Sequence, residues 1–203
     1  MKKNKISKNW INKQRRDTYV RQSKVDGYRA RSVYKLIEID EKFKVFKNNQ
    51  KIIDIGSAPG SWSQYVIKTF KNVKLISVDL KEMKKIGNSY QIMGDFTDPK
   101  IKKKITDYFK NKADVLMSDM AVNTTGIKDL DSIQTSELCI EAIKFSKEIL
   151  NENGQLITKI FMGSSFNEVI DQAKKIYKKD SIFKPKSSRK DSKESCLICK
   201  KLR

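Results

Sequence analysis

The sequence contains no histidine and only three cysteines in 203 residues. Without histidine, Ser-His-Asp and Cys-His catalysis, histidine-ligated metals and imidazole as a general base are all excluded. Cys139, Cys196 and Cys199 are too few for a disulfide framework, so we expect a protein of the reducing cytoplasm. Acid–base chemistry in this chain must therefore use lysine, carboxylate, tyrosine, serine or cysteine side chains.

Long apolar runs are also missing. No run approaches the roughly 18 to 20 apolar residues that a membrane span needs, and the Lys- and Asn-rich N-terminus lacks the apolar centre of a signal peptide. A chain of 203 residues has the size of one domain. We therefore expect a single globular domain that acts as a monomer and does not associate with membranes.

Positive charge is abundant and unevenly placed. The chain has 44 Lys and Arg against 24 Asp and Glu, a net charge of +20. Residues 1–51 hold 16 basic and 5 acidic side chains, residues 52–179 hold 20 and 16, and residues 180–203 hold 8 and 3. A lysine-biased genome would enrich the middle as well, so the two basic ends indicate a surface that meets nucleic-acid phosphates.

The chain divides into a basic arm, residues 1–27, and one domain, residues 28–203. Apolar runs predict strands at 51–55, 73–79, 90–93, 113–118 and 155–161. Helical stretches are expected at about 30–43, 61–70, 99–110, 131–150 and 165–178, with Gly154 ending the fourth of them. Two last strands, near 181–184 and 194–200, follow each other without a helix. This alternation predicts an α/β, doubly wound, mostly parallel sheet with an antiparallel edge hairpin.

A glycine-containing loop, Asp54-Ile-Gly-Ser-Ala-Pro-Gly-Ser-Trp62, joins the first strand to the first following helix, where open α/β sheets bind ligands. Asp79 ends the second strand and is placed to bind a ribose diol; Asp95 ends the third and is placed to bind an adenine amino group. Both a nicotinamide dinucleotide and S-adenosylmethionine fit such acids. The dinucleotide fingerprint needs a glycine where Ala58 stands, and Pro59 removes an N–H donor. The loop therefore favours S-adenosylmethionine.

Several segments together carry a family resemblance. In order and spacing, from about residue 16 to the end, the chain resembles the FtsJ/RrmJ (RlmE) family of large-subunit ribosomal RNA 2′-O-methyltransferases. The matching segments are Arg29–Leu36, Asp54–Gln64, Ser118–Ala121, Lys159–Phe161, Lys184–Arg189 and Ser192–Glu194. Departures are small: Ser57 and Ser61 replace other small residues, and Met162-Gly163-Ser164 replaces a more polar turn.

The resemblance implies a Rossmann-like fold, S-adenosylmethionine as cofactor and ribosomal RNA within the large subunit as substrate, with a uridine of 23S RNA as the target. It implies a catalytic set of Lys35, Asp119, Lys159 and Glu194. The expected cofactor-binding residues are Gly56, Pro59, Gly60, Trp62, Asp79, Asp95, Phe96 and Asp119. Arg29, Arg31, Lys184 and Arg189 are expected to bind RNA phosphates, and Trp10 and Tyr19 of the arm to stack on bases.

The implied chemistry is self-consistent. A sulfonium methyl donor is already activated, so no metal is expected, but the ribose 2′-hydroxyl is a weak acid and needs a base. Without histidine, Lys159 is the candidate base, and a neighbouring ammonium on Lys35 is expected to lower its pKa. Asp119 is expected to orient Lys159, and Glu194 to position Lys35. Cys196 and Cys199 point to opposite faces of a strand and are not expected to bind metal.

Three alternatives remain open. The first is an NAD-type oxidoreductase on the same sheet, which Pro59 and the basic ends disfavour. The second is a non-catalytic RNA-binding factor for ribosome assembly, which the intact catalytic set disfavours. The third is a 2′-O-methyltransferase that acts on another RNA.

Overall fold

The computed structural model describes residues 14, 16–110, 112–122, 128–189 and 192–203. Seven strands form one sheet in the order β3-β2-β1-β4-β5-β7-β6. The first five are mutually parallel, and β7 runs antiparallel between β5 and β6. The bounds are β1 Lys51–Ile55, β2 Lys74–Asp79, β3 Tyr90–Met93, β4 Ala113–Ser118, β5 Leu150–Phe161, β6 Tyr177–Phe183 and β7 Glu194–Leu202. The predicted doubly wound sheet with an antiparallel edge hairpin is confirmed.

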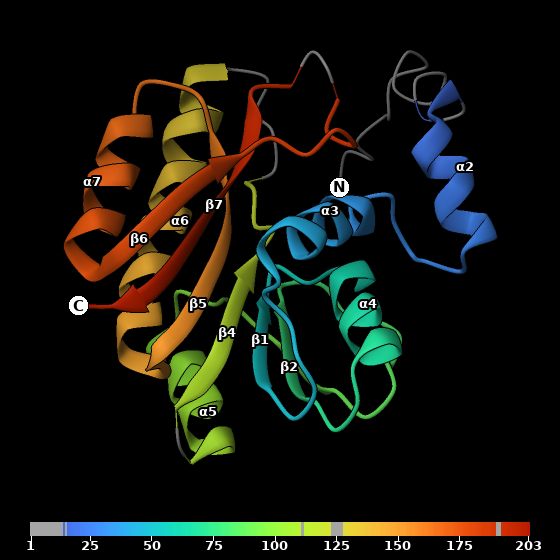
Figure 1. Ribbon diagram of the computed structural model, residues 1–203, viewed down its shortest axis with the longest axis horizontal. Helices are drawn as coiled ribbons and strands as arrows, with labels where there is room; N and C mark the ends of the chain where they lie inside the picture. Colours follow the sequence, from blue (N-terminus) through green and yellow to red (C-terminus); the bar gives the residue numbers. More distant parts are fainter. Residues whose placement is uncertain (1–13, 15, 111, 123–127, 190–191) are drawn as a thin grey trace, which may run out of the picture.

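Helices cover both faces of this sheet (Figure 1). One face carries α3 (Val33–Phe43) and α4 (Ser61–Thr69), and the other carries α5 (Pro99–Phe109), α6 (Lys128–Ile149) and α7 (Phe166–Ile176). The strands between them are buried on both sides, as parallel strands usually are. In β1, Ile52 packs toward α3 and α4, whereas Ile53 and Ile55 pack toward α5 and α6.

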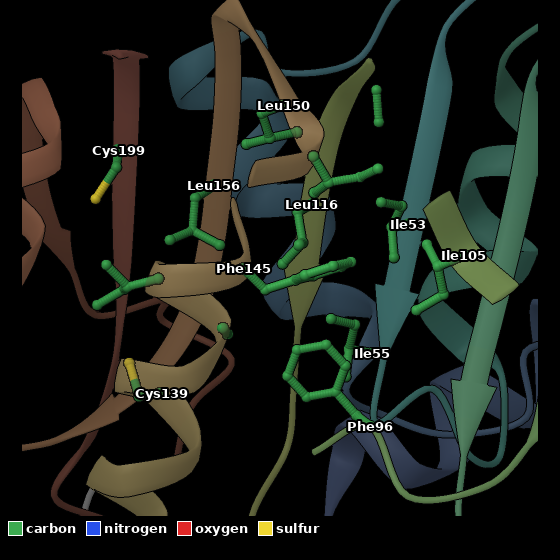
Figure 2. Close-up of a cluster of buried hydrophobic side chains, with 14 of the residues drawn as sticks. Ile53, Ile55, Phe96, Ile105, Leu116, Cys139, Phe145, Leu150, Leu156 and Cys199 are labelled. Carbon is green, nitrogen blue, oxygen red and sulfur yellow. The ribbon is translucent and has the colours of Figure 1, made fainter. Parts of the chain in front are cut away.

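The larger core lies on the α5–α7 face. Figure 2 shows Ile53, Ile55 and Leu116 of the central strands meeting Phe145 of α6 and Phe96, which follows β3. The rings of Phe96 and Phe145 meet edge to face, with centroids 5.4 Å apart. Because Phe96 sits at the carboxyl edge of the sheet, this core also supports the residues that line the site described below.

A helix that the sequence did not predict, α2 (Thr18–Val25), lies inside the expected arm. Asp17 caps it by accepting a hydrogen bond from the Tyr19 N–H (3.1 Å). The helix lies beside α3, where the rings of Tyr19 and Tyr34 are 5.3 Å apart (Figure 1). Lys2, Lys3, Lys5, Lys8, Trp10, Lys13 and Arg15 of the arm lie outside the described residues.

Two predicted boundaries are wrong near the antiparallel edge. β5 begins at Leu150 rather than at residue 155, because Leu150 already pairs with Ala113 of β4 and the register shifts before Gln155. The helix before it ends at Ile149, close to the expected end, and Gly154 lies inside β5. β6 begins at Tyr177, directly after α7, rather than near residue 181. In both places the helix continues directly into a strand, and no glycine or proline lies between them to mark the boundary in the sequence.

Candidate active site

A pocket of about 490 Å³ opens at the carboxyl ends of β1, β2, β3 and β4. It lies where the strand order reverses, between β1 and β4, as expected for a ligand site in an open α/β sheet. Its lining residues are Gly56, Ala58, Val78, Asp79, Leu80, Lys81, Gly94, Asp95, Phe96, Thr97, Asp119, Met120, Ala121, Val122 and Leu138. Five of the sequence-predicted cofactor residues are among them: Gly56, Asp79, Asp95, Phe96 and Asp119.

The loop after β1 depends on two glycines. Gly56 has φ +70°, and a Cβ there would lie 2.9 Å from the Met120 Cα. Gly60 has φ +103° at the start of α4, and a Cβ there would collide with the Ile86 side chain. Larger residues would be strained at both positions. The glycines therefore let the loop lie close to the segment after β4 and to the connection after β2.

Two carboxylates at neighbouring strand ends shape the pocket wall. Asp79 accepts hydrogen bonds from the N–H groups of Ala58 (2.9 Å) and Lys81 (2.8 Å). Asp95 accepts from the Thr97 N–H and hydroxyl, both at 2.8 Å and both on Oδ1. A carboxylate has about four acceptor sites. Both residues therefore retain acceptor capacity toward a ligand in the pocket.

Three predicted cofactor residues lie beside the pocket rather than in its lining. The Trp62 side chain is buried in the α3–α4 core, and its indole N–H donates to the Ser32 carbonyl (2.9 Å). Pro59 follows a cis peptide bond, and Gly60 precedes α4. The main-chain N–H of Trp62 lies in the first turn of α4, where helical amides lack intrahelical partners.

Pairing between strands brings the four predicted catalytic residues together. Ser118 of β4 is in register with Thr158 of β5, so the next residues, Asp119 and Lys159, are adjacent. Glu194 pairs with Phe161, two positions beyond Lys159 and therefore on the same face of the sheet. Lys35 reaches this face from α3. Four segments far apart in the sequence thus place two ammonium groups and two carboxylates in one cluster.

Within this cluster Asp119 is shared by both lysines. Lys159 Nζ donates to the Asp119 main-chain carbonyl (2.7 Å) and to its Oδ1 (3.0 Å). Lys35 Nζ pairs with Glu194 and lies 4.0 Å from Asp119 Oδ1. Lys159 is only 8% exposed. Both lysines are therefore held by fixed partners rather than free in solvent.

Burial and charge act against each other here. Burial pushes the pKa of Lys35 down, but the carboxylates of Asp119 and Glu194 outweigh it, so this pKa lies above its ordinary value. Burial pushes the pKa of Asp119 up, but Lys159 and Lys35 outweigh it and leave this pKa lowered. The two carboxylates therefore favour the charged form of Lys35. The sequence predicted Lys35 only as a charge that acts on Lys159, and it did not predict how firmly Asp119 and Glu194 hold this lysine.

A second pocket, of about 380 Å³, adjoins the Lys35–Glu194 pair. Its lining residues are Gln14, Arg31, Ser32, Lys35, Arg189, Ser192 and Glu194. Arg31 pairs with Asp17 and donates to the Ser187 carbonyl, and Arg189 Nε lies 3.5 Å from Asp17 Oδ2. Two of the predicted RNA-binding residues, Arg31 and Arg189, therefore flank the catalytic cluster.

The other two predicted RNA-binding residues lie elsewhere. Lys184 Nζ donates to the Ser192 carbonyl (2.7 Å), across the loop between β6 and β7. Arg29 donates from its guanidinium to the carbonyls of Pro59, Lys84 and Lys85. The structure therefore directs three of the Arg29 hydrogen bonds to the protein main chain, beside the cofactor loop.

A buried carboxyl lies beneath the loop. Asp54 is fully buried; its Oδ2 accepts from the Ser63 hydroxyl (2.6 Å), and its Oδ1 has no partner among the described residues. Burial raises the pKa of Asp54 to about 7, against the opposing hydrogen bond from Ser63. The folded protein therefore binds this proton more tightly than the unfolded chain, in which an aspartate titrates near about pH 4.

This difference predicts a pH-dependent stability. Between about pH 4 and pH 7 the native state keeps the Asp54 proton and the unfolded state loses it, so the free energy of unfolding falls as pH rises. Asp54→Asn removes this contribution. Denaturant titrations from about pH 4.5 to 8 should show the variant gaining stability relative to the parent as pH rises. Parallel curves for the two proteins would contradict the assignment.

Within the described ranges, no group of three or more Asp, Glu or Cys side chains is arranged to hold a metal ion. In the same part of the chain, no helix combines the length and the apolar character that crossing a membrane requires.

The fold and the pocket are those of a Rossmann-like domain with a ligand-sized pocket at the carboxyl edge of its sheet. Comparison with known proteins narrows the class. Residues 28–202 match the sequence model of the FtsJ-like methyltransferases. The chain is 64% identical to the ribosomal RNA large subunit methyltransferase E of Pelagibacter ubique (strain HTCC1062), over the whole of both chains. It belongs to the FtsJ-like methyltransferase family.

Solved structures of other methyltransferases share the fold of this chain. A ribosomal RNA methyltransferase from Plasmodium falciparum superposes with a TM-score of 0.77 at 34% identity, over 86% of this chain and 98% of the other. A methyltransferase from Streptococcus mutans, solved in complex with SAH, shares the fold with a TM-score of 0.52 at 14% identity, over 84% and 95%. The predicted fold and enzyme class, a methyltransferase, are confirmed.

Proposed function

We propose that this enzyme transfers a methyl group from S-adenosylmethionine to a ribose 2′-hydroxyl, most specifically that of a uridine in 23S RNA of the large ribosomal subunit. The observation that carries the proposal is the position of Asp119. This residue lines the 490 Å³ pocket and also holds Lys159 through two hydrogen bonds. A methyl donor in the pocket and a base on Lys159 would thus share one residue.

The pocket suits S-adenosylmethionine in its donor and acceptor groups. Asp79 and Asp95 offer carboxylate oxygens to a ribose diol and an adenine amino group, and Phe96 and Leu138 supply apolar lining. Pro59 and Ala58 stand where a pyrophosphate-binding turn would need N–H donors and glycine, which disfavours a nicotinamide dinucleotide. S-Adenosylmethionine supplies a methyl group bound to a sulfonium. Once that methyl group is transferred, the rest of the cofactor is a neutral thioether.

Lys159 is the proposed base that removes the hydroxyl proton. A neutral lysine amine has two N–H groups and one lone pair; here two hydrogen bonds from Nζ are directed to Asp119, so the remaining tetrahedral position is left for the 2′-hydroxyl. The 2′-oxygen forms its bond to the methyl carbon as the carbon–sulfur bond breaks, and the proton passes to Lys159. Asp119 then stabilises the ammonium that forms.

The second pocket is suited to the nucleotide that carries this hydroxyl. Lys35 and Glu194 form its wall on the side of the catalytic cluster, and Arg31 and Arg189 supply cations for flanking phosphates. Lys184 lies in the same β6–β7 loop as Arg189. Holding the ribose in line with the methyl donor avoids much of the entropic barrier to a two-substrate reaction.

The basic arm is expected to strengthen RNA binding through charge. Removing residues 1–13 deletes Lys2, Lys3, Lys5, Lys8 and Lys13 but keeps Asp17, which is paired with Arg31. For every RNA phosphate that the shortened chain no longer neutralises, the plot of log affinity against log salt should become flatter by about 0.7 to 0.9. RNA binding by the full and shortened chains is measured across a salt series. Identical slopes and affinities would show that the arm does not bind RNA; cofactor binding should be equal in both.

Two measurements separate this function from its alternatives. Calorimetric titration with S-adenosylmethionine and with NAD tests the cofactor, and only the first should bind. Transfer of labelled methyl groups to large ribosomal subunits then distinguishes the enzyme from a non-catalytic assembly factor. Binding of NAD alone, or cofactor binding without transfer to any RNA, would contradict the proposal. Transfer to a different RNA with the same ribose product would correct only its substrate.

A further inference from the structure

Arg29 connects three segments around the cofactor pocket. Its Nη1 donates to the carbonyls of Pro59 (3.0 Å) and Lys84 (2.7 Å), and its Nη2 to that of Lys85 (2.9 Å). Its own N–H donates to Gln64 Oε1 in α4 (2.8 Å). The Arg29 side chain therefore links the loop after β1 to the connection between β2 and β3. The Arg29 main chain is held by α4.

The connection between β2 and β3, residues 80–89, depends on side-chain contacts of this kind for its position. It contains no helix or strand, yet its first residues, Leu80 and Lys81, form part of the pocket wall. Ile86 packs against Gly60, where a side chain would also come within 3.1 Å of the Arg29 guanidinium. The Ser57 hydroxyl lies 3.6 Å from the sulfur of Met83. The connection is thus fastened to the cofactor loop along its length, and Arg29 provides the charge-assisted hydrogen bonds.

We propose that Arg29 is a positioning residue for the cofactor pocket and not a ligand of RNA phosphates, an inference that rests on the proposed function. Both hydrogens of Nη1 go to carbonyls of two different segments. A planar guanidinium with five donors can do this, and a lysine ammonium, a single centre, reproduces it poorly. A phosphate bound to Nη1 of Arg29 would have to displace one of the two main-chain carbonyls that this nitrogen holds beside the pocket.

Three variants separate the two roles. Arg29→Gln and Arg29→Lys are compared with Arg189→Gln, which removes a cation of the second pocket. Arg29→Gln should raise the dissociation constant and the KM for S-adenosylmethionine about tenfold, the effect of losing one charge-assisted hydrogen bond. Arg29→Lys should recover part of this loss. The turnover number and the salt slope of RNA binding should stay within about twofold of the parent. Arg189→Gln should do the reverse, with a flatter RNA slope and unchanged cofactor affinity.

A readout without cofactor keeps this inference separable from the proposed function. In ligand-free protein, hydrogen exchange at the amides of residues 80–86 should be faster in Arg29→Gln than in the parent, and unchanged in Arg189→Gln. A parent protein that fails to bind S-adenosylmethionine would overturn the proposed function, while faster exchange would still support the link through Arg29. Unchanged exchange, or unchanged cofactor affinity with a flatter RNA slope in Arg29→Gln, would overturn the positioning role.

Discussion

Lys159→Ala should reduce methyl transfer by roughly 10² to 10⁴-fold, the range that a general base contributes. Its Nζ is held by the Asp119 carbonyl and carboxylate, and the parallel register between β4 and β5 places it there. The dissociation constant for S-adenosylmethionine should change by no more than a few-fold, because Lys159 is not among the residues that line the cofactor pocket. Single-turnover transfer with enzyme in excess over RNA measures the first quantity, and calorimetry the second.

Lys178→Ala is the matched control, since Lys178 is exposed on β6 and distant in register from the cluster. It should transfer methyl groups at the parental rate. Turnover by Lys159→Ala within a few-fold of the parent would show that another group takes the proton. Loss of activity together with loss of cofactor affinity would mean instead that the substitution collapses the region around Asp119.

Asp79→Ala should weaken binding of S-adenosylmethionine roughly 30- to 100-fold, as expected for a lost charge-assisted interaction of about 2 to 3 kcal/mol. Part of this loss comes from the loop, because Asp79 also holds the N–H groups of Ala58 and Lys81. A cofactor product analogue that lacks the ribose hydroxyls separates the two parts. The parent should discriminate strongly between S-adenosylhomocysteine and this analogue.

The variant should bind both compounds with nearly equal, weak affinity if Asp79 contacts the diol. Discrimination that survives in Asp79→Ala would place the diol elsewhere and leave Asp79 a role in loop geometry alone. Asp107→Ala, at an exposed residue of α5 paired with Lys103, is a suitable control and should bind as the parent does.

The sheet was predicted from the apolar runs of the sequence, whereas the catalytic set was implied by the family resemblance; a physical rule accounts for where one member of that set lies. A buried lysine in an apolar strand is costly unless it has partners, and strand periodicity assigns faces once the strands are placed. Lys159 follows this rule. Cys196 and Cys199 follow it as well: they lie in different core clusters on opposite faces of the sheet, all three cysteines being free.

The sequence did not predict which side chains, far apart along the chain, contact one another in the fold. Nothing in the pattern indicates that Asp17 pairs with Arg31 and Arg189, or that Arg29 reaches the carbonyls of Lys84 and Lys85. From the sequence alone, Arg29 is interpreted as a phosphate ligand, and only the fold shows the main-chain acceptors that its guanidinium meets. The N-cap Asp17 was the one available signal for α2, since an aspartate before Thr18-Tyr19 is a helix-start pattern.

The position of the transferred methyl group decides the proposed function most directly. Large ribosomal subunits lacking this modification are incubated with the enzyme and methyl-labelled S-adenosylmethionine, and their RNA is digested to nucleosides and separated. We predict label in one 2′-O-methylated nucleoside, 2′-O-methyluridine, and roughly 10² to 10⁴-fold slower labelling when Lys159→Ala replaces the parent. Label on a base, or label incorporated equally by Lys159→Ala, would contradict this function.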